Sequence, residues 1–327
     1  MPSKEMLDKI RNFPKQFNFE PVVENAGVLK QAESFVVLGM GGSNLTASLI
    51  QTADPFLDLI CHRDYGLPAL KDATLRNSLI IASSYSGNTE EILDGFNAAL
   101  VKGLDVAVIA KGGKLLDLAK QNSVPFVELP SVDVQPRISA GFQLMALLKL
   151  MGKEEELKKA RLLSQTINAN ELEKEGERLA GLLSGKIPVV YSSLKNLPLA
   201  RNWKIKFNET AKIPAFFNVF PELNHNEMTG FDVASATKAL SEYFYFIFLE
   251  DDSDDNPRVL RRMSVLRELY TQRGLPVEQI KIAGNNTWGK IFNTILIADF
   301  AAYFLAKHYN VDPEQVPMVE EFKRMII

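Results

Sequence analysis

A short apolar run that turns directly into a helix limits what this chain can fold into more than any other stretch. The run is residues 80–82, a serine-rich turn follows at residues 83–89, and apolar residues then recur at helical spacing at Leu93, Phe96 and Leu100. The first amides of a helix lack internal partners and carry the positive end of its dipole, so they favour an anion, with hydroxyl donors available from Ser84, Ser86 and Thr89. The stretch also fits an ordinary helix start, with Ser86 or Asn88 as the N-cap and Glu91 completing a capping box.

An earlier stretch has the same shape. Residues 35–38 are an apolar run, Gly39–Asn44 is a glycine-rich turn, and a helix is predicted over residues 44–52. Two such turns, about 45 residues apart, favour neighbouring parallel strands that deliver both loops to one edge of a sheet. A dinucleotide-binding fold is the weaker alternative, because Asn44 replaces the third glycine of its G-x-G-x-x-G motif. A Walker A loop is excluded, because no lysine follows the glycines.

Apolar runs and helical patterns alternate along the whole chain, as in parallel sheets covered on both faces. The sequence therefore predicts an α/β fold with two subdomains, each a parallel sheet flanked by helices. The two turns resemble those of the sugar isomerase (SIS) domain, which implies that the subdomains are of SIS type. A charged stretch at Gly152–Lys159 begins the connection, which gives an N-terminal domain of residues 1–152 and a C-terminal domain of residues 153–327. The C-terminal half repeats the order of the first, but its first turn, Ser192–Lys195, lacks glycine. Anion binding is accordingly expected in the N-terminal domain.

The elements are predicted as follows. Strands are expected at residues 35–38, 57–62, 78–83, 104–110, 124–129, 187–191, 216–220, 243–249 and 279–282. Helices are expected in residues 1–30 and at residues 44–52, 89–101, 114–121, 138–151, 168–184, 196–212, 257–273 and 286–308.

Composition excludes several classes of function. The 37 Lys and Arg against 40 Asp and Glu give a formal charge of −3, which argues against a nucleic-acid partner. The single cysteine, Cys61, rules out an internal disulfide framework, and with three scattered histidines no metal site or cofactor is expected. The N-terminus has no apolar core of signal-peptide length, and the most apolar run, residues 291–306, is interrupted by Asn293 and Asp299. We expect a cytoplasmic protein with no membrane partner, in which that run is a buried helix.

Two dense polar clusters lie at residues 206–215 and 221–227. Together with the two turns above, they complete a set of six motifs in a fixed order: Gly-Met-Gly-Gly-Ser (39–43), Ser-Tyr-Ser-Gly-Asn-Thr (84–89), Pro-Arg (136–137), Phe-Asn-Glu-x-Ala-Lys (207–212), Pro-Glu-x-x-His-Asn (221–226) and a late Lys323. The set resembles the bifunctional phosphoglucose/phosphomannose isomerases, a family of sugar isomerase (SIS) domain proteins. Each motif alone is modest, whereas six in the family's order are specific.

The resemblance implies an aldose–ketose isomerase that interconverts glucose 6-phosphate and fructose 6-phosphate, and also mannose 6-phosphate and fructose 6-phosphate. Such a reaction needs a base that reaches C1 and C2, a cation facing the enediolate, and groups that open the sugar ring. The family pattern places Glu209 as the base, Arg137 beside the enediolate, and His225 with Lys323 at ring opening. The sugar phosphate would be held by Gly41, Gly42, Ser43, Ser84, Ser86 and Thr89. In the family the histidine reaches the neighbouring subunit's site, which implies a homodimer with shared active sites.

Other interpretations remain open at this stage. Without the family, Glu209 and Lys212 would pass for a solvated helix pair, His225 for a structural histidine, and Arg137 and Lys323 for surface charges. The chain could also isomerise a heptose or amino-sugar phosphate, or be a non-catalytic sugar-phosphate sensor, although it has no basic helix-turn-helix extension. Two positions depart from the family pattern: Asn44, where a glycine is common, and Val316, where some members have threonine. They leave the choice between glucose and mannose substrates undecided.

Overall fold

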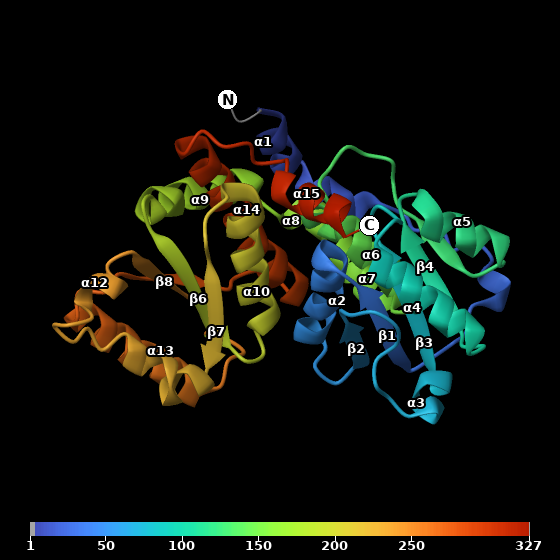
Figure 1. The fold of residues 1–327 in the computed structure, drawn as a ribbon, viewed down its shortest axis with the longest axis horizontal. Helices are drawn as coiled ribbons and strands as arrows, with labels where there is room; N and C mark the ends of the chain where they lie inside the picture. Colours follow the sequence, from blue (N-terminus) through green and yellow to red (C-terminus); the bar gives the residue numbers. More distant parts are fainter. Residues whose placement is uncertain (1–3, 327) are drawn as a thin grey trace. The chain divides into compact units, whose positions relative to one another are not determined.

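The computed structural model describes residues 4–326, which divide into two compact units (Figure 1). The first unit is residues 12–167, and the second is helix α1 (Lys4–Arg11) together with the described chain from Asn168 onward. This division falls later than the predicted boundary between residues 152 and 153. The physical reason is that two short helices in the charged stretch, α7 (Glu154–Arg161) and α8 (Leu163–Thr166), bury apolar side chains against α6 (Ala140–Leu150) and η1 (Phe13–Asn18).

The first unit is built on a five-stranded parallel sheet in the order β2-β1-β3-β4-β5. Helices α2 and α6 cover one face, and α4 and α5 cover the other (Figure 1). The central strands β1 and β3 pair so that Gly39 lies opposite Ser83, which brings the two turns that follow them to the same edge. The strands are β1 (Ser34–Gly39), β2 (Asp58–His62), β3 (Ser78–Ser84), β4 (Val106–Ala110) and β5 (Phe126–Glu128). The helices, besides those above, are η2 (Ala26–Val28), α2 (Gly41–Ala53), α3 (Asp72–Asn77), α4 (Glu90–Val101), α5 (Gly113–Gln121) and η3 (Pro136–Ile138).

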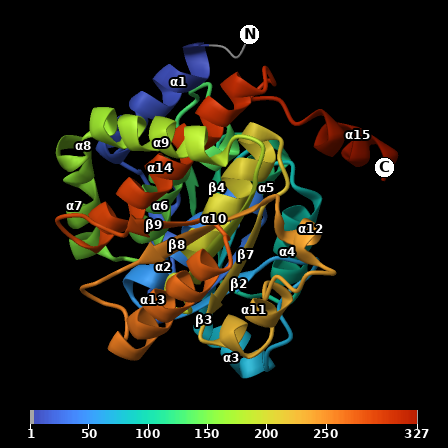
Figure 2. The same cartoon turned by 90° about the vertical axis from the view of Figure 1, so that its left-hand side faces the viewer.

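The second unit has a four-stranded parallel sheet in the order β7-β6-β8-β9. One face packs aromatic side chains against helix α13, and the other is covered by α10 and α14 (Figure 2). The strands are β6 (Ile187–Ser193), β7 (Phe216–Phe220), β8 (Phe244–Glu250) and β9 (Val277–Lys281). The helices are α9 (Ala169–Leu183), α10 (Leu197–Lys206), η4 (Phe207–Ala211), η5 (Glu222–His225), α11 (Glu227–Gly230), α12 (Lys238–Ser241), α13 (Pro257–Gln272), α14 (Thr287–His308) and α15 (Pro317–Met325).

Helix α14 forms the core of the second unit. It is the one described helix long and apolar enough to cross a bilayer, but 89% of its most apolar window is buried inside the protein. It packs closely on α9, where a Cβ added to Gly176 would lie 2.4 Å from Cβ of Phe300. The prediction of a buried helix over residues 286–308 is therefore confirmed.

The predicted α/β architecture of two parallel sheets flanked by helices is confirmed. Several elements differ from expectation. Of the helical region predicted in residues 1–30, the described part has an α-helix only at Lys4–Arg11, followed by the 3-10 turns Phe13–Asn18 and Ala26–Val28. Helix α2 begins at Gly41 rather than at residue 44, so the glycines of the first turn belong to the helix start. The helix predicted over residues 196–212 changes after Lys206 into the π-helical turn η4.

Candidate active site

The serine-rich turn between β3 and α4 is stabilised by hydrogen bonds of its own hydroxyl groups. The Ser84 and Thr89 hydroxyls share a hydrogen bond of 2.8 Å, and the Gly87 amide donates to the Ser84 hydroxyl at 3.1 Å. Ser84 is buried, whereas Ser86 is exposed and accepts from the Asn88 amide at 3.2 Å. The buried hydroxyl thus shapes the turn, and the exposed Ser86 hydroxyl is the one presented to solvent.

The alternative of a capped helix start is wrong in its details. Helix α4 begins at Glu90 with Thr89 in the N-cap position, and no side chain caps it. Asn88 instead accepts a hydrogen bond from the Lys114 amide at 3.1 Å, which ties this turn to the start of α5. Gly87 has a φ of +71°, and a Cβ there would lie 1.7 Å from the Gly112 carbonyl, so only glycine fits.

The glycine-rich turn between β1 and α2 lies against the segment that carries Arg137. A Cβ added to Gly42 would lie 2.6 Å from the Pro136 carbonyl oxygen, so the two backbones are in direct contact. Arg137 itself is 4% exposed, on the short helix η3. Asn44, at the position that departs from the family, is buried and donates to the His62 carbonyl at 3.3 Å. The first unit therefore brings together Gly41, Gly42, Ser43 and Arg137.

Buried amides that sequence reasoning missed hold the Arg137 segment in place. The Gln16 side chain donates to the Ile138 carbonyl at 2.7 Å and accepts from the Gly141 amide at 3.0 Å. The Gln143 side chain donates to the Ser139 hydroxyl at 2.7 Å, and that hydroxyl donates to the Pro136 carbonyl at 2.8 Å. Gln16 gives no sequence signal, because its partners lie more than 120 residues along the chain.

The loop that leads from β5 to Arg137 is fastened to the same edge of the sheet. Its Val132 carbonyl accepts hydrogen bonds from the Lys111 ammonium at 2.9 Å and from the Tyr85 hydroxyl at 3.4 Å. Burial, together with the nearby Asp133 carboxylate, raises the pKa of Tyr85 to about 12. Tyr85 therefore stays a neutral hydrogen-bond donor over the physiological pH range.

Glu209 lies in the second unit, on the π-helical turn η4, with its side chain half-buried. The turn ends at Lys212, which has a left-handed φ of +58° and donates from its ammonium group to the Glu209 carbonyl. The Asn208 amide donates to the Ile213 carbonyl at 2.9 Å. The Asn208 and Lys212 side chains therefore stabilise the turn around Glu209 by donating hydrogen bonds to backbone carbonyls.

His225 ends the short helix η5 and is exposed. Its loop is anchored on either side, by the fully buried Leu223 and by the Glu227 carboxylate, which accepts from the Tyr191 hydroxyl at 2.5 Å and from the Asn218 amide. Burial raises the pKa of Tyr191 well above its usual value, and Tyr270 and Glu227 add to this. The protein holds the base of the loop firmly and presents the imidazole outward.

Glu209 and His225 lie at opposite ends of strand β7. Helix α10 runs back from the carboxyl end of β6, so η4 precedes the first residue of β7, whereas η5 follows its last. A strand of five residues spans about 13 Å between its end Cα atoms. Glu209 and His225 of one chain therefore belong to segments that flank opposite ends of the same strand.

Lys323 lies on the C-terminal helix α15, which has no buried residue. Its ammonium group is 2.8 Å from the Glu320 carboxylate, and both side chains are more than half exposed. Such a pair contributes little to stability, which leaves Lys323 available for another role.

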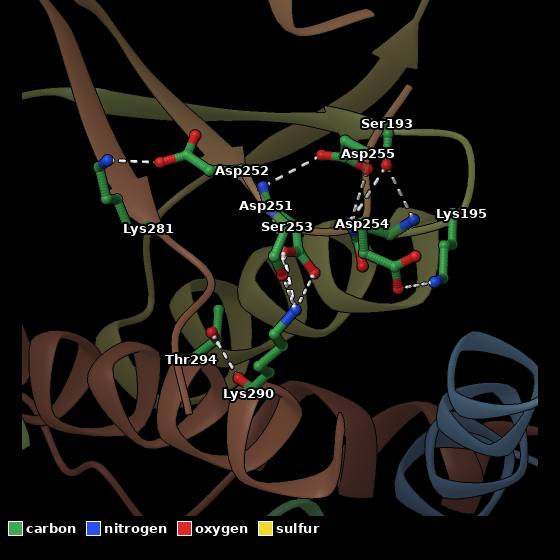
Figure 3. Close-up of polar contacts among 11 residues, drawn as sticks. Ser193, Lys195, Asp251, Asp252, Ser253, Asp254, Asp255, Lys281, Lys290 and Thr294 are labelled. Carbon is green, nitrogen blue, oxygen red and sulfur yellow. Dashed lines mark hydrogen bonds and ion pairs between the residues drawn. The ribbon is translucent and has the colours of Figure 1, made fainter. Parts of the chain in front are cut away.

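In the second unit, the edge that corresponds to the serine-rich turn is filled by the protein's own carboxylates (Figure 3). Asp255 accepts from the Asn196 amide at 3.1 Å and from the Asp251 backbone amide at 3.1 Å. Burial raises the pKa of Asp255. Lysines pair with the remaining carboxylates: Lys290 with Asp251, Lys195 with Asp254 and Lys281 with Asp252.

Within residues 4–326, no group of three or more His, Cys, Asp or Glu side chains is arranged to hold a metal ion.

Comparison with known proteins identifies the family of this chain. It is 32% identical to a bifunctional phosphoglucose/phosphomannose isomerase of Aquifex aeolicus over 328 residues, which cover 98% of each chain. The chain belongs to the bifunctional phosphoglucose/phosphomannose isomerase family. The family model described as the bacterial phospho-glucose isomerase C-terminal SIS domain matches residues 172–326. That match covers most of the unit that carries Glu209 and His225.

The family has relatives with other chemistry on the same fold. The chain is 26% identical to a D-glucosamine-6-phosphate 4-epimerase of Sulfolobus acidocaldarius, over 94% of each chain. Among solved structures, the tagatose-6-phosphate ketose/aldose isomerase of Escherichia coli matches with a TM-score of 0.69 over 94% of each chain, at 15% identity. This last likeness establishes the fold alone.

Proposed function

We propose that this protein is an aldose–ketose isomerase that interconverts glucose 6-phosphate and fructose 6-phosphate, and mannose 6-phosphate and fructose 6-phosphate. The observation that supports it best is the 32% identity over 98% of the chain to a relative that carries both activities in its name. The serine-rich turn adds support, because it presents helix-start amides and the Ser86 hydroxyl at the edge next to Arg137's segment. The reaction would serve glycolysis or gluconeogenesis in the cytoplasm, according to its direction.

The proposed chemistry assigns one task to each group. The Glu209 carboxylate takes a proton from C2 of the aldose and returns it to C1, through an enediolate in which C1 and C2 share a double bond. The Arg137 guanidinium lies beside the enediolate oxygens and stabilises their negative charge. His225 and Lys323 transfer the protons that open the pyranose ring. Gly41, Gly42, Ser43, Ser84, Ser86 and Thr89 position the phosphorylated sugar, and no metal or cofactor takes part.

The position of His225 supports a homodimer with shared sites. In a pyranose the ring oxygen is bonded to C1, so the base and the ring-opening acid must act on neighbouring atoms. Glu209 of one chain precedes β7 and His225 follows it, and the end Cα atoms of that strand are about 13 Å apart. A two-fold dimer resolves this conflict if each chain lends its exposed His225 to the site of its partner.

One incubation tests the proposed activity. The purified protein is given fructose 6-phosphate, and the hexose phosphates that form are separated and identified. We expect both glucose 6-phosphate and mannose 6-phosphate. Formation of neither would refute the proposal, and formation of one alone would restrict it to that aldose.

A second candidate is isomerisation or epimerisation of an amino-sugar phosphate, which the Sulfolobus acidocaldarius relative favours. The same protein is therefore incubated with glucosamine 6-phosphate. Conversion of this substrate, with fructose 6-phosphate left unchanged, would replace the first proposal with the second.

A further inference from the structure

A lysine and an aspartate are buried as an ion pair in the core of the second unit. The Lys206 ammonium lies 2.7 Å from the Asp299 carboxylate, and both side chains are 1% exposed. Lys206 is the last residue of α10, and Asp299 lies midway along the apolar helix α14. Because both charges are removed from water, such a pair stabilises a fold no better than an apolar pair of similar size. Stability alone therefore does not explain why the chain buries this ion pair.

The pair lies where the helix changes its geometry. The next residue, Phe207, begins the π-helical turn η4, and Glu209 lies on that turn. A π-helical turn holds about one more residue than an α-helical turn and is frequently found at functional sites. If η4 relaxed to α-helical geometry, the residues within it and after it would rotate around the helix axis, by up to about 100°. The direction of the Glu209 side chain therefore depends on keeping this turn.

Apolar packing contributes to holding the turn, but less directionally than a pair of charges does. Trp203 and Phe207 are fully buried, with ring centroids 6.2 Å apart, but hydrophobic contacts are non-directional and tolerate small rotations. The Asn208 and Lys212 hydrogen bonds close the far end of the turn. The Lys206–Asp299 contact is a directional, charge-assisted contact at its near end, and it joins the end of α10 to α14.

We propose that the Lys206–Asp299 pair fixes the π-helical turn and thereby positions Glu209 for proton transfer. The inference rests on the proposed function, in which Glu209 is the base. Lys206 and Asp299 are positioning residues, because they act through the turn rather than on the sugar. Their removal lowers kcat and leaves KM nearly unchanged, because the serine-rich turn that is proposed to hold the phosphate lies in the other unit.

The test replaces both charges at once, so that no single buried charge remains. The Lys206→Met/Asp299→Val variant should stay folded, because an apolar pair takes the place of a desolvated ion pair. Its kcat on fructose 6-phosphate should fall by about 100-fold, as expected for a misplaced catalytic group, with KM within about twofold of the wild type. The matched control is Lys9→Met/Glu314→Met, which removes a partly buried pair of the same unit and should leave kcat unchanged.

A double-mutant cycle with Glu209→Gln separates positioning from a general loss of structure. If the pair acts through Glu209, adding Lys206→Met/Asp299→Val to Glu209→Gln lowers kcat no further. Full additivity, or a folded double variant with kcat within about threefold of the wild type, would overturn the inference. If the double variant does not fold, Asp299→Asn takes its place in the same cycle. A Glu209→Gln variant with wild-type kcat would instead overturn the assignment of the base in the proposed function.

Discussion

Gly42 leaves no room for a side chain beside Arg137. A Cβ at this position would lie 2.6 Å from the Pro136 carbonyl oxygen, so Gly42→Ala must push the Pro136–Arg137 segment away. A displacement of about 1 Å costs an active site up to about 100-fold in rate. We expect kcat/KM on fructose 6-phosphate to fall by about 10- to 100-fold.

Gly27→Ala is the matched control, because a Cβ there meets nothing within 4 Å in the same unit. It should keep the activity of the wild type. A Gly42→Ala enzyme with unchanged kcat/KM would show that the contact with Pro136 does not matter for catalysis.

Removal of the Glu209 carboxylate should lower kcat and leave the affinity for the sugar phosphate unchanged. Glu209→Gln keeps the size of the side chain and removes the base, so kcat should fall by about 100-fold or more. The dissociation constant of the sugar phosphate, measured by calorimetry, should stay within about threefold of the wild type. Loss of binding together with loss of rate would place Glu209 among the groups that hold the substrate.

At the residue scale, sequence motifs located the turns but not the contacts that support them. The motif Ser-Tyr-Ser-Gly-Asn-Thr predicted a polar turn, yet it did not reveal that the Ser84 hydroxyl is buried and bonded to Thr89. Gln16 was missed because a glutamine is recognisable as a buried support only when its distant partners are known. Glu227 could have been found, since it directly follows the Pro-Glu-x-x-His-Asn motif.

At the scale of elements, the acidic loop after β8 is a structural part of the second sheet. Asp255→Ala would leave the Asn196 amide and the Asp251 backbone amide without their acceptor, which costs about 1–3 kcal/mol of stability. Asp254→Ala removes only a half-exposed ion pair with Lys195, worth about 0–1 kcal/mol. Urea unfolding of the two variants should give a clearly lower midpoint for Asp255→Ala. Equal midpoints would contradict this role of Asp255.

Strands were predictable because each is an apolar run bounded by polar turns, and all nine predicted runs overlap an observed strand. The π-helical turn was not predictable in this way. Trp203, Phe207 and Ala211 keep a helical spacing, so the sequence indicated one continuous helix over residues 196–212. The change of geometry coincides with the ion pair to Asp299, a partner supplied by a helix far along the chain.

At the scale of the whole molecule, shared sites predict recovery of activity between two defective chains. Glu209→Gln and His225→Ala should each be inactive alone. When the two are refolded together, random pairing makes about half of the dimers mixed, and each mixed dimer has one site free of both defects. About a quarter of the wild-type activity should therefore return.

Mass spectrometry of the refolded mixture provides the control, because it counts the mixed dimers directly. If mixed dimers are present and no activity returns, each chain supplies its own His225. The Lys206–Asp299 contact between α10 and α14 would be unaffected by that result.

The first unit is inserted into the second, since residues 12–167 separate α1 from the rest of its own unit. Met6 and Ile10 of α1 are fully buried, and α1 packs against α9 and α14. During synthesis α1 is made before the inserted unit, and α14 is made after it. The inserted unit can therefore fold before α9 and α14 have been synthesised. Until then the apolar side chains of α1 have no partner helix in their own unit. A ribosome paused when residue 167 has just left its exit tunnel would carry one complete unit and one unpaired helix of the other.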